Sequence, residues 1–163
     1  MAVALIRIDE RLLHGQVIVG WGERLDLRWY VVADDELAEA TWEQEIYAAG
    51  LPPRAEARFL TVEEAREALP SLDDRAEPGA VLTRGTEAMR RLADGGLLEG
   101  RRVNLGCLAG DPGRREALSY VHLSPGEAED LRALARAGAS VSARDVPDAR
   151  SVVLEEVLDA LGD

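Results

Sequence analysis

The chain has 163 residues, the usual size of one domain, and we expect residues 1–163 to form a single domain. Its 31 acidic and 19 basic residues give a net charge of −12. This charge argues against broad binding to nucleic acids or anionic lipids, since both need a dense basic face. All of the basic residues are arginine, so the sequence excludes Schiff-base chemistry and a P-loop, which need lysine.

The single cysteine, Cys107, excludes an internal disulfide and favours a reducing compartment. No apolar run approaches the roughly 20 residues of a membrane span. The N-terminal apolar stretch is too short for a signal peptide and lacks its basic front. We therefore expect a cytoplasmic protein, which can still associate peripherally with the membrane through a membrane-embedded partner.

Short apolar segments alternate with segments of helical periodicity along the whole chain. The apolar run 29–33 ends in two aspartates, as is typical of a buried parallel strand. Capping boxes at 61–64 and 124–127 predict two helix starts. In chain order we expect strands at 3–8, 29–33, 55–60, 80–83, 101–105, 119–123 and 139–143, and helices at 15–25, 36–49, 62–69, 86–92, 125–138 and 148–161.

These repeated strand–helix units predict an α/β fold. We expect a three-layer, open, mostly parallel sheet with helices on both faces and an antiparallel hairpin near one edge. The segment 119–123, close behind the strand at 101–105, is the expected hairpin strand. Ligands gather at the carboxyl ends of parallel strands. Four loops therefore become candidate sites: 9–15, 33–36, 83–86 and 104–111.

The loop after the first strand carries the residue types best suited to chemistry. Its sequence, with flanks, is Arg7-Ile-Asp9-Glu-Arg11-Leu-Leu-His14-Gly15-Gln16. Imidazole is a good phosphoryl acceptor near neutral pH, glycine lets a ligand approach the backbone, and free N–H groups at a helix start bind anions. Arg11 can add a bidentate contact to phosphate, and Asp9 can orient the imidazole or the guanidinium. The alternative is that His14 is an ordinary polar loop residue.

Other candidates have structural alternatives. Arg84 and Thr86 follow a predicted strand and can approach a phosphate or a partner surface, but Thr86 can equally cap a helix and Arg84 can be a solvated charge. The acidic run 34–36 can hold Mg²⁺ or cap a helix, and we favour the cap. We expect packing for Cys107 and a structural role for His122, and we expect no metal and no cofactor.

The remaining large apolar side chains are expected to pack. The tryptophans are interpreted as core or interface anchors, and the C-terminal apolar stripe as packing on the sheet or forming a contact in a homo-oligomer. These residues are Trp21, Trp29 and Trp42, and Val153, Val157 and Leu161.

The stretch from Arg7 to Val17, followed by Trp21, resembles the opening of the mannose/fructose/sorbose-family IIB components of the bacterial sugar phosphotransferase system (PTS). Similar segments continue at 31–38, at the Pro-Pro pair 52–53 and at 104–106, so the likeness covers most of the chain. The sequence departs from the family pattern after Gly106, where Cys107 replaces a second glycine, and this puts partner recognition in question.

The resemblance implies a phosphotransferase that takes a phosphoryl group from phospho-IIA and passes it to a sugar, which the membrane components IIC and IID carry inward. It also implies an α/β fold with a mainly parallel sheet. His14 matches the phosphorylated histidine, Arg11 the arginine that steadies the phosphoryl group, and Asp9 a carboxylate beside it. Backbone N–H groups near Gly15 and Gln16 are expected to neutralise phosphate charge together with Arg11.

Two further functional interpretations stay open. In the first, His14 is phosphorylated in a regulatory protein that signals to a partner, and no sugar receives the group. In the second, weaker interpretation the chain is a nucleotide-binding α/β domain, but no Gly-x-Gly-x-x-Gly follows the first strand. The sequence does not specify the sugar.

Overall fold

The computed structural model describes residues 2–162, so the ends of the predicted domain at 1 and 163 lie outside the described residues. Its main sheet has seven strands in the order β3-β2-β4-β1-β5-β8-β9, and every pairing is parallel except that of β8 with β9. The strands are β1 (Val3–Ile8), β2 (Trp29–Ala33), β3 (Glu56–Leu60), β4 (Gly79–Thr83), β5 (Arg102–Leu105), β8 (Ser140–Ala143) and β9 (Val152–Val153).

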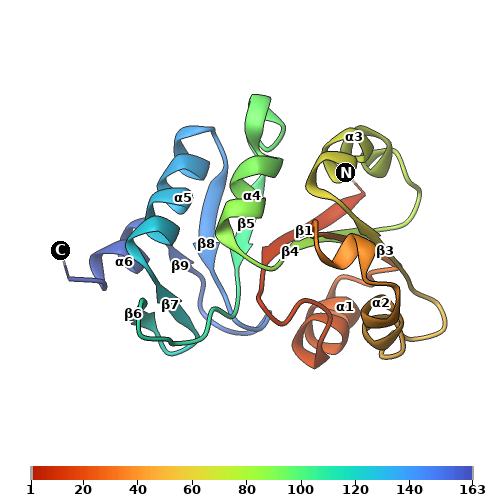
Figure 1. Cartoon of the computed structure of the whole chain (residues 1–163), viewed down its shortest axis with the longest axis horizontal. Helices are drawn as coiled ribbons and strands as arrows, with labels where there is room; N and C mark the ends of the chain where they lie inside the picture. The colour runs from red at the N-terminus through yellow and green to blue at the C-terminus, as the bar shows by residue number, and fades with distance from the viewer. Residues whose placement is uncertain (1, 163) are drawn as a thin grey trace.

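Helices cover the sheet on both faces, as Figure 1 shows, with α3, α4, α5 and α6 on one side and α1 and α2 on the other. The helical segments are η1 (Gln16–Trp21, a π-helix), α1 (Gly22–Arg24), η2 (Leu37–Glu39), α2 (Thr41–Ala48), α3 (Val62–Asp73), α4 (Thr86–Leu92), η3 (Asp94–Gly96), α5 (Pro125–Arg136) and α6 (Leu154–Asp159). Within residues 2–162, none of these helices has the length and apolar character needed to cross a membrane.

Two hydrophobic clusters fill the spaces between the layers. Alternate residues of β1 divide between them, because successive side chains of a strand point to opposite faces. Ile6 and Ile8 belong to the larger cluster under α3, α4, α5 and α6, whereas Leu5 belongs to the smaller cluster under η1 and η2. The central position of β1, between β4 and β5, places the loop that follows it in the middle of the carboxyl edge of the sheet.

The structure confirms the predicted three-layer α/β class, the antiparallel hairpin and both capping boxes. The hairpin is a separate two-stranded sheet of β6 (Arg115–Leu118) and β7 (Val121–Leu123). The strand expected at 119–123 was therefore too long, since residues 119 and 120 form the turn between β6 and β7.

Three further local predictions were wrong. The helix expected at 148–161 begins only at Leu154, because Val152 and Val153 pair antiparallel with β8. Val153 consequently does not pack on the core and is 60% exposed. Thr86 does not cap α4, because Gly85 occupies the cap position and Thr86 is the first helical residue. The helix expected at 36–49 is interrupted at Ala40, which separates η2 from α2.

Trp29 packs so closely against a neighbouring strand that only glycine fits opposite it. It lies beside Gly79 in the parallel pairing of β2 with β4, and a Cβ at Gly79 would lie 1.9 Å from the Trp29 ring. The ring is 1% exposed, and its Nε1–H donates to the Glu77 carbonyl at 2.8 Å. The indole therefore has no room to move away from a larger neighbour.

We expect Gly79→Ala to lower the free energy of unfolding by about 2–3 kcal/mol, because the added methyl overpacks a rigid aromatic contact. Urea denaturation followed by circular dichroism measures this. Gly126→Ala in α5 is the matched control, since no atom lies closer than 3.9 Å to its added Cβ and alanine favours a helix. An equal loss in both variants would contradict the packing argument.

Candidate active site

The loop after β1 is bound to the loops that follow both neighbouring strands. The Asp9 N–H donates to the Thr83 carbonyl at 2.9 Å, on the β4 side. The Glu10 N–H donates to the Cys107 carbonyl at 3.0 Å, on the β5 side. Leu12, at φ 53° and fully buried, then turns the chain toward η1. The candidate site therefore lies on a fixed backbone at the carboxyl edge of the sheet.

His14 is held by Asp9, which in turn is held by Arg7. The His14 Nε2 atom lies 2.9 Å from Asp9 Oδ2, and Arg7 Nη2 donates to the same oxygen at 2.9 Å. Asp9 Oδ1 accepts the Arg11 backbone N–H at 3.0 Å. The side chains of Arg7 and Asp9 are fully buried, whereas that of His14 is 15% exposed. The structure thus brings together Asp9 and His14, as the sequence predicts.

The charge of Asp9 follows from its surroundings. Burial is the strongest single influence and raises the pKa of the carboxyl, but hydrogen bonds from His14 and Arg11 and the positive charge of Arg7 together hold that pKa below its usual value. Burial likewise lowers the pKa of Arg7, against the opposing influence of Asp9. Asp9 is therefore a carboxylate at neutral pH, and as an acceptor it places the His14 proton on Nε2.

Arg7 is the residue of the site that sequence reasoning missed. Its guanidinium donates to Asp9, to the Asn104 side-chain oxygen and to the backbone carbonyls of Arg144 and Asp145, the last two at 2.9 and 3.2 Å. The Trp21 ring centroid lies 5.6 Å from its central carbon. A charged residue inside the apolar first strand was the available signal, because buried arginines are almost always paired.

Gly106 and Trp21 complete the enclosure of Arg7. A Cβ at Gly106 would lie 2.4 Å from the guanidinium, so only glycine fits there. The Trp21 Nε1–H donates to the Asp145 carbonyl at 3.1 Å, the same oxygen that accepts from Arg7. The expectation that Trp21 is a core anchor therefore holds, and its core position is next to the site.

Arg11, Gly15 and Gln16 are close to His14 in sequence, and part of their capacity to bind a ligand is unused. Arg11 Nη2 donates to the Gln16 side-chain oxygen at 2.7 Å, and within residues 2–162 the Arg11 guanidinium forms no ion pair. A Cβ at Gly15 would meet no atom within 4 Å, so the space beside that backbone is open. An anion can therefore approach the Gly15 backbone without displacing packed groups.

Arg84 and Thr86 are bound elsewhere. Arg84 Nε donates to Asp34 at 3.1 Å, and the Thr86 hydroxyl, in a side chain only 2% exposed, donates to Asp130 at 2.8 Å. In the part of the chain that the structure describes, no hydrogen bond or ion pair joins either residue to His14, Asp9 or Arg7. Their predicted contact with phosphate or a partner stays a prediction.

The aspartates after β2 act as caps. Asp34 Oδ1 accepts the Leu37 N–H at 2.8 Å, and Asp35 Oδ1 accepts the Val62 N–H at 2.9 Å. Asp34 also pairs with Arg84, and Asp35 with Arg91. These contacts agree with the capping alternative. Among residues 2–162 no group of three or more His, Cys, Asp or Glu side chains is arranged to hold a metal ion.

The other potential reactive groups have different surroundings. His122 lies in β7, where its Nδ1 contacts the Leu108 carbonyl at 3.2 Å and its Nε2 lies 3.4 Å from Glu116. Cys107 is partly buried, and burial is the main cause that raises the pKa of its thiol, which disfavours the nucleophilic thiolate. These contacts fit the structural roles expected for both residues. Trp42, in contrast, is 67% exposed and is no core anchor.

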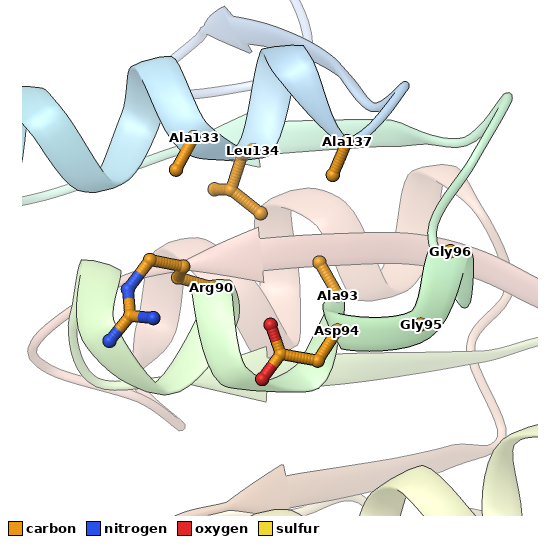
Figure 2. Close-up of a pocket in the computed structure, with 8 residues that line it drawn as sticks. All are labelled: Arg90, Ala93, Asp94, Gly95, Gly96, Ala133, Leu134 and Ala137. Atoms are coloured by element: carbon orange, nitrogen blue, oxygen red, sulfur yellow. The ribbon is translucent and has the colours of Figure 1, made fainter.

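A cavity of about 280 Å³ between α4 and α5 is separate from this site (Figure 2). Small apolar side chains of the two helices face each other there, with Arg90 and Asp94 on the α4 side. Arg90 is already paired with Asp130 at 3.0 Å. No histidine or cysteine lines the cavity, so the carboxyl edge of the sheet remains the candidate active site.

The fold and the site define an α/β protein with an oriented histidine at the carboxyl ends of its strands. The sequence model of the PTS system sorbose subfamily IIB component matches residues 3–162, and the chain belongs to this family. It is therefore a IIB component of a PTS sugar system, in a phosphotransferase family, and the mannose/sorbose resemblance is confirmed.

Relatives and solved structures agree with this placement. The N-acetylgalactosamine-specific phosphotransferase enzyme IIB component 1 of Escherichia coli K12 is 30% identical, over 89% of this chain and 91% of the relative. The PTS system mannose-specific EIIAB component of the same organism is 26% identical, over 90% of this chain and 45% of the relative. The crystal structure of manxB from Thermoanaerobacter tengcongensis superposes with a TM-score of 0.84 at 28% identity, covering 99% and 97% of the two chains.

We expect Asp9→Asn to lower the free energy of unfolding by about 3–5 kcal/mol at pH 7, because it leaves the buried Arg7 charge without a counterion. In the folded protein the pKa of Asp9 lies below its value in the unfolded chain, which is about 3.9. The carboxylate therefore contributes fully to stability above the unfolded pKa, and this contribution is lost as the pH falls through the folded pKa. Urea titrations at pH 7 and pH 3 should show the gap between variant and wild type shrinking in acid.

The control is Asp159→Asn, which removes an exposed carboxylate from the end of α6. It should change stability by no more than about 0.5 kcal/mol at either pH. A gap for Asp9→Asn that stays constant between pH 7 and pH 3 would show that ionisation of Asp9 does not stabilise the fold.

Proposed function

We propose that His14 accepts a phosphoryl group on Nδ1 from phospho-IIA and transfers it to a sugar during PTS uptake. One observation carries this proposal: the Nε2 atom of His14 lies 2.9 Å from Asp9, a buried carboxylate that is itself held by Arg7. With its proton fixed on Nε2, the imidazole has its free lone pair on Nδ1. That nitrogen belongs to a partly exposed side chain, as a group that must meet two partners requires.

The transfer needs few groups. The Nδ1 lone pair forms a bond to phosphorus while the bond between phosphorus and the donor histidine nitrogen breaks, and the electron pair of that bond returns to the donor. The Nε2 proton stays on His14, where Asp9 stabilises the positive charge that develops on the ring. In the second step the oxygen of a sugar hydroxyl forms a bond to phosphorus and its proton leaves to water, while the bond between phosphorus and Nδ1 breaks and its electron pair returns to Nδ1. Asp9 and Arg7 act by orienting the ring, so that Nδ1 can attack phosphorus in line with the bond that breaks.

The negative charge on the phosphoryl group must be neutralised by groups that do not bind it too tightly for it to leave again. Arg11 is suited to this, since its guanidinium is bound only to the neutral Gln16 side chain and can turn toward phosphate oxygens. Gly15 and Gln16 begin the helical segment after His14, where backbone N–H groups precede the helix's own hydrogen bonds. Open space beside Gly15 supports close approach of the phosphate.

The partners follow from the family. A IIA protein or domain supplies the phosphoryl group, and the name of the mannose-specific EIIAB relative joins IIA and IIB in one protein. Membrane components IIC and IID, with the sugar, complete the system. Within this proposal the protein works at the cytoplasmic side of the membrane, and the segment after β4, which contains Arg84 and the first residue of α4, Thr86, faces the phosphate or IIA. A homo-oligomer is compatible with these roles.

His14→Gln should abolish phosphorylation, because glutamine offers no nucleophilic nitrogen. The experiment incubates the protein with the general phosphotransferase proteins, the cognate IIA and labelled phosphoenolpyruvate, and measures acid-labile label. His122→Gln, which removes the other histidine of the chain, is the matched control and should keep full label. Nitrogen-15 NMR of the phosphorylated protein should show the phosphoryl group on Nδ1. Label retained in a folded His14→Gln protein would sink the proposal.

Arg11→Ala should slow phosphoryl transfer by about a hundredfold, the usual cost of removing one donor to developing charge. The fold should be unaffected, since the Arg11 side chain is exposed and its bond to Asp9 uses the backbone. Rapid-quench measurement of transfer from phospho-IIA gives the rate. Arg58→Ala removes another exposed arginine, from β3, and should transfer at the wild-type rate. Equal rates for Arg11→Ala and wild type would remove Arg11 from the mechanism.

A further inference from the structure

Within residues 2–162, one part of the sheet has no helix packed on it. The smaller hydrophobic cluster contains no residue of β5, β8 or β9, so the face of these strands opposite α5 is uncovered. Val103 and Val141 point toward α5, whereas Arg102 and Ser140 point away from it, following the alternation of a strand. A groove of about 450 Å³ lies on this face. Its volume is in the range of small-molecule sites.

Polar side chains form the floor of the groove. Arg102 lies beside Ser140, and Asn104 beside Ser142, in the parallel register of β5 with β8. The Ser151 side chain lines the groove as well, and Trp21 and Leu25 of the neighbouring helical segments form an apolar wall. Hydroxyl and amide groups next to an aromatic wall are suited to a polyhydroxylated ligand.

The groove is also basic in a strongly acidic protein. None of its lining residues is acidic, although the whole chain carries a net charge of −12. Within residues 2–162 the Arg102 guanidinium has no hydrogen bond or ion pair, and that of Arg144 donates only to the Pro147 carbonyl, at 3.3 Å. Most other arginines contact a carboxylate, as Arg114 does with Glu127 at 2.7 Å. Two guanidiniums without counterions therefore meet one groove.

The two arginines start from widely separated backbone positions. Arg102 is level with Ser140, and Arg144 lies four residues further along the same strand direction, where its N–H still donates to the Leu105 carbonyl at 3.1 Å. At about 3.3 Å per residue, the two backbone positions are about 13 Å apart. An elongated ligand with an anionic group at each end can use both arginines.

We propose that this groove binds a small polyhydroxylated molecule with an anionic group at each end, of which a sugar bisphosphate is the simplest form. Arg102 holds one terminal phosphate and Arg144 the other, since guanidinium suits phosphate oxygens in charge and in planar geometry. Ser140, Ser142 and the Asn104 amide bind the hydroxyls between them. This site is distinct from His14 and goes beyond the proposed phosphoryl transfer.

The Arg144 end of the groove adjoins the residues that hold the active site. The Asn104 side-chain oxygen accepts a hydrogen bond from Arg7, and its Nδ2 donates to the Arg144 carbonyl at 3.2 Å. Arg7 donates to that same carbonyl at 2.9 Å. A ligand on Arg144 and Asn104 therefore touches the groups that fix Arg7, and through Arg7 it adjoins Asp9 and His14.

The test titrates the full chain with fructose 1,6-bisphosphate, fructose 6-phosphate, fructose and inorganic phosphate. Calorimetry gives affinity, and the NMR signals of the Trp21 indole N–H and the Asn104 side-chain amide report location. We expect the bisphosphate to bind about tenfold more tightly than the monophosphate, and fructose not to bind. Arg102→Gln and Arg144→Gln should each reduce bisphosphate affinity to the level of the monophosphate. Arg58→Gln makes the same charge change outside the groove and should bind like wild type.

Several outcomes would overturn the proposal. Equal affinity for the bisphosphate, the monophosphate and inorganic phosphate would show that only an anion is attracted. An equal loss in Arg58→Gln and Arg102→Gln would show a general charge effect, and binding that leaves the Trp21 and Asn104 signals unmoved would place the ligand elsewhere. Absence of saturable binding to a folded wild-type protein would also exclude the site. Labelling of His14 by phospho-IIA is measured separately, so either proposal can fail while the other stands.

Discussion

The buried ion pair between Arg7 and Asp9 is the constraint on which the candidate active site depends. Two opposite charges without solvent are tolerated only when geometry is good and the remaining polar atoms are satisfied. Here the guanidinium has acceptors on Asp9, Asn104, Arg144 and Asp145, and within residues 2–162 no buried side-chain nitrogen or oxygen lacks a partner. The pair consequently holds one charged oxygen in a fixed place against His14, and this sets which ring nitrogen is free.

The acceptors of Arg7 explain why the site needs the whole fold. Asn104 belongs to β5, and Arg144 and Asp145 follow β8, so segments about a hundred residues apart in sequence must pair in register before the guanidinium is satisfied. Gly106 is required at the same point because a side chain there would meet the guanidinium. The strand register that stabilises the fold is therefore also the register that builds the site. A shift of β5 against β1 would leave the Arg7 charge buried without partners.

The parts of the structure that sequence predicts are those that local chemistry decides. The strand Trp29–Ala33 is apolar throughout, and the capping boxes at Thr61 and Ser124 contain both members of each pair, so all three were confirmed. The sequence makes the loop Asp9–Gly15 a candidate site because a strand end, a histidine and a glycine coincide there. In contrast, β9 forms through its pairing with β8, and the burial of Arg7 depends on distant acceptors as well as on Asp9. Neither leaves a periodic signal, because both depend on contacts made after the sheet has formed.

The distribution of charge around His14 fits a group that is carried and then released. The strong charges, Arg7 and Asp9, are neutralised by each other in the interior and face the imidazole from the Nε2 side. Arg11, the cation that we propose to meet the phosphate at Nδ1, is exposed and bound to a neutral amide. A buried cation facing the phosphoryl group would hold it as firmly as Asp9 holds Arg7. Transfer to a second acceptor would then be slow, because such a cation would stabilise the phosphorylated protein as much as the transition state. Only binding that is stronger in the transition state speeds transfer. Separation of the orienting charges from the phosphate side therefore lets one fixed imidazole serve both the acceptance and the release that we propose.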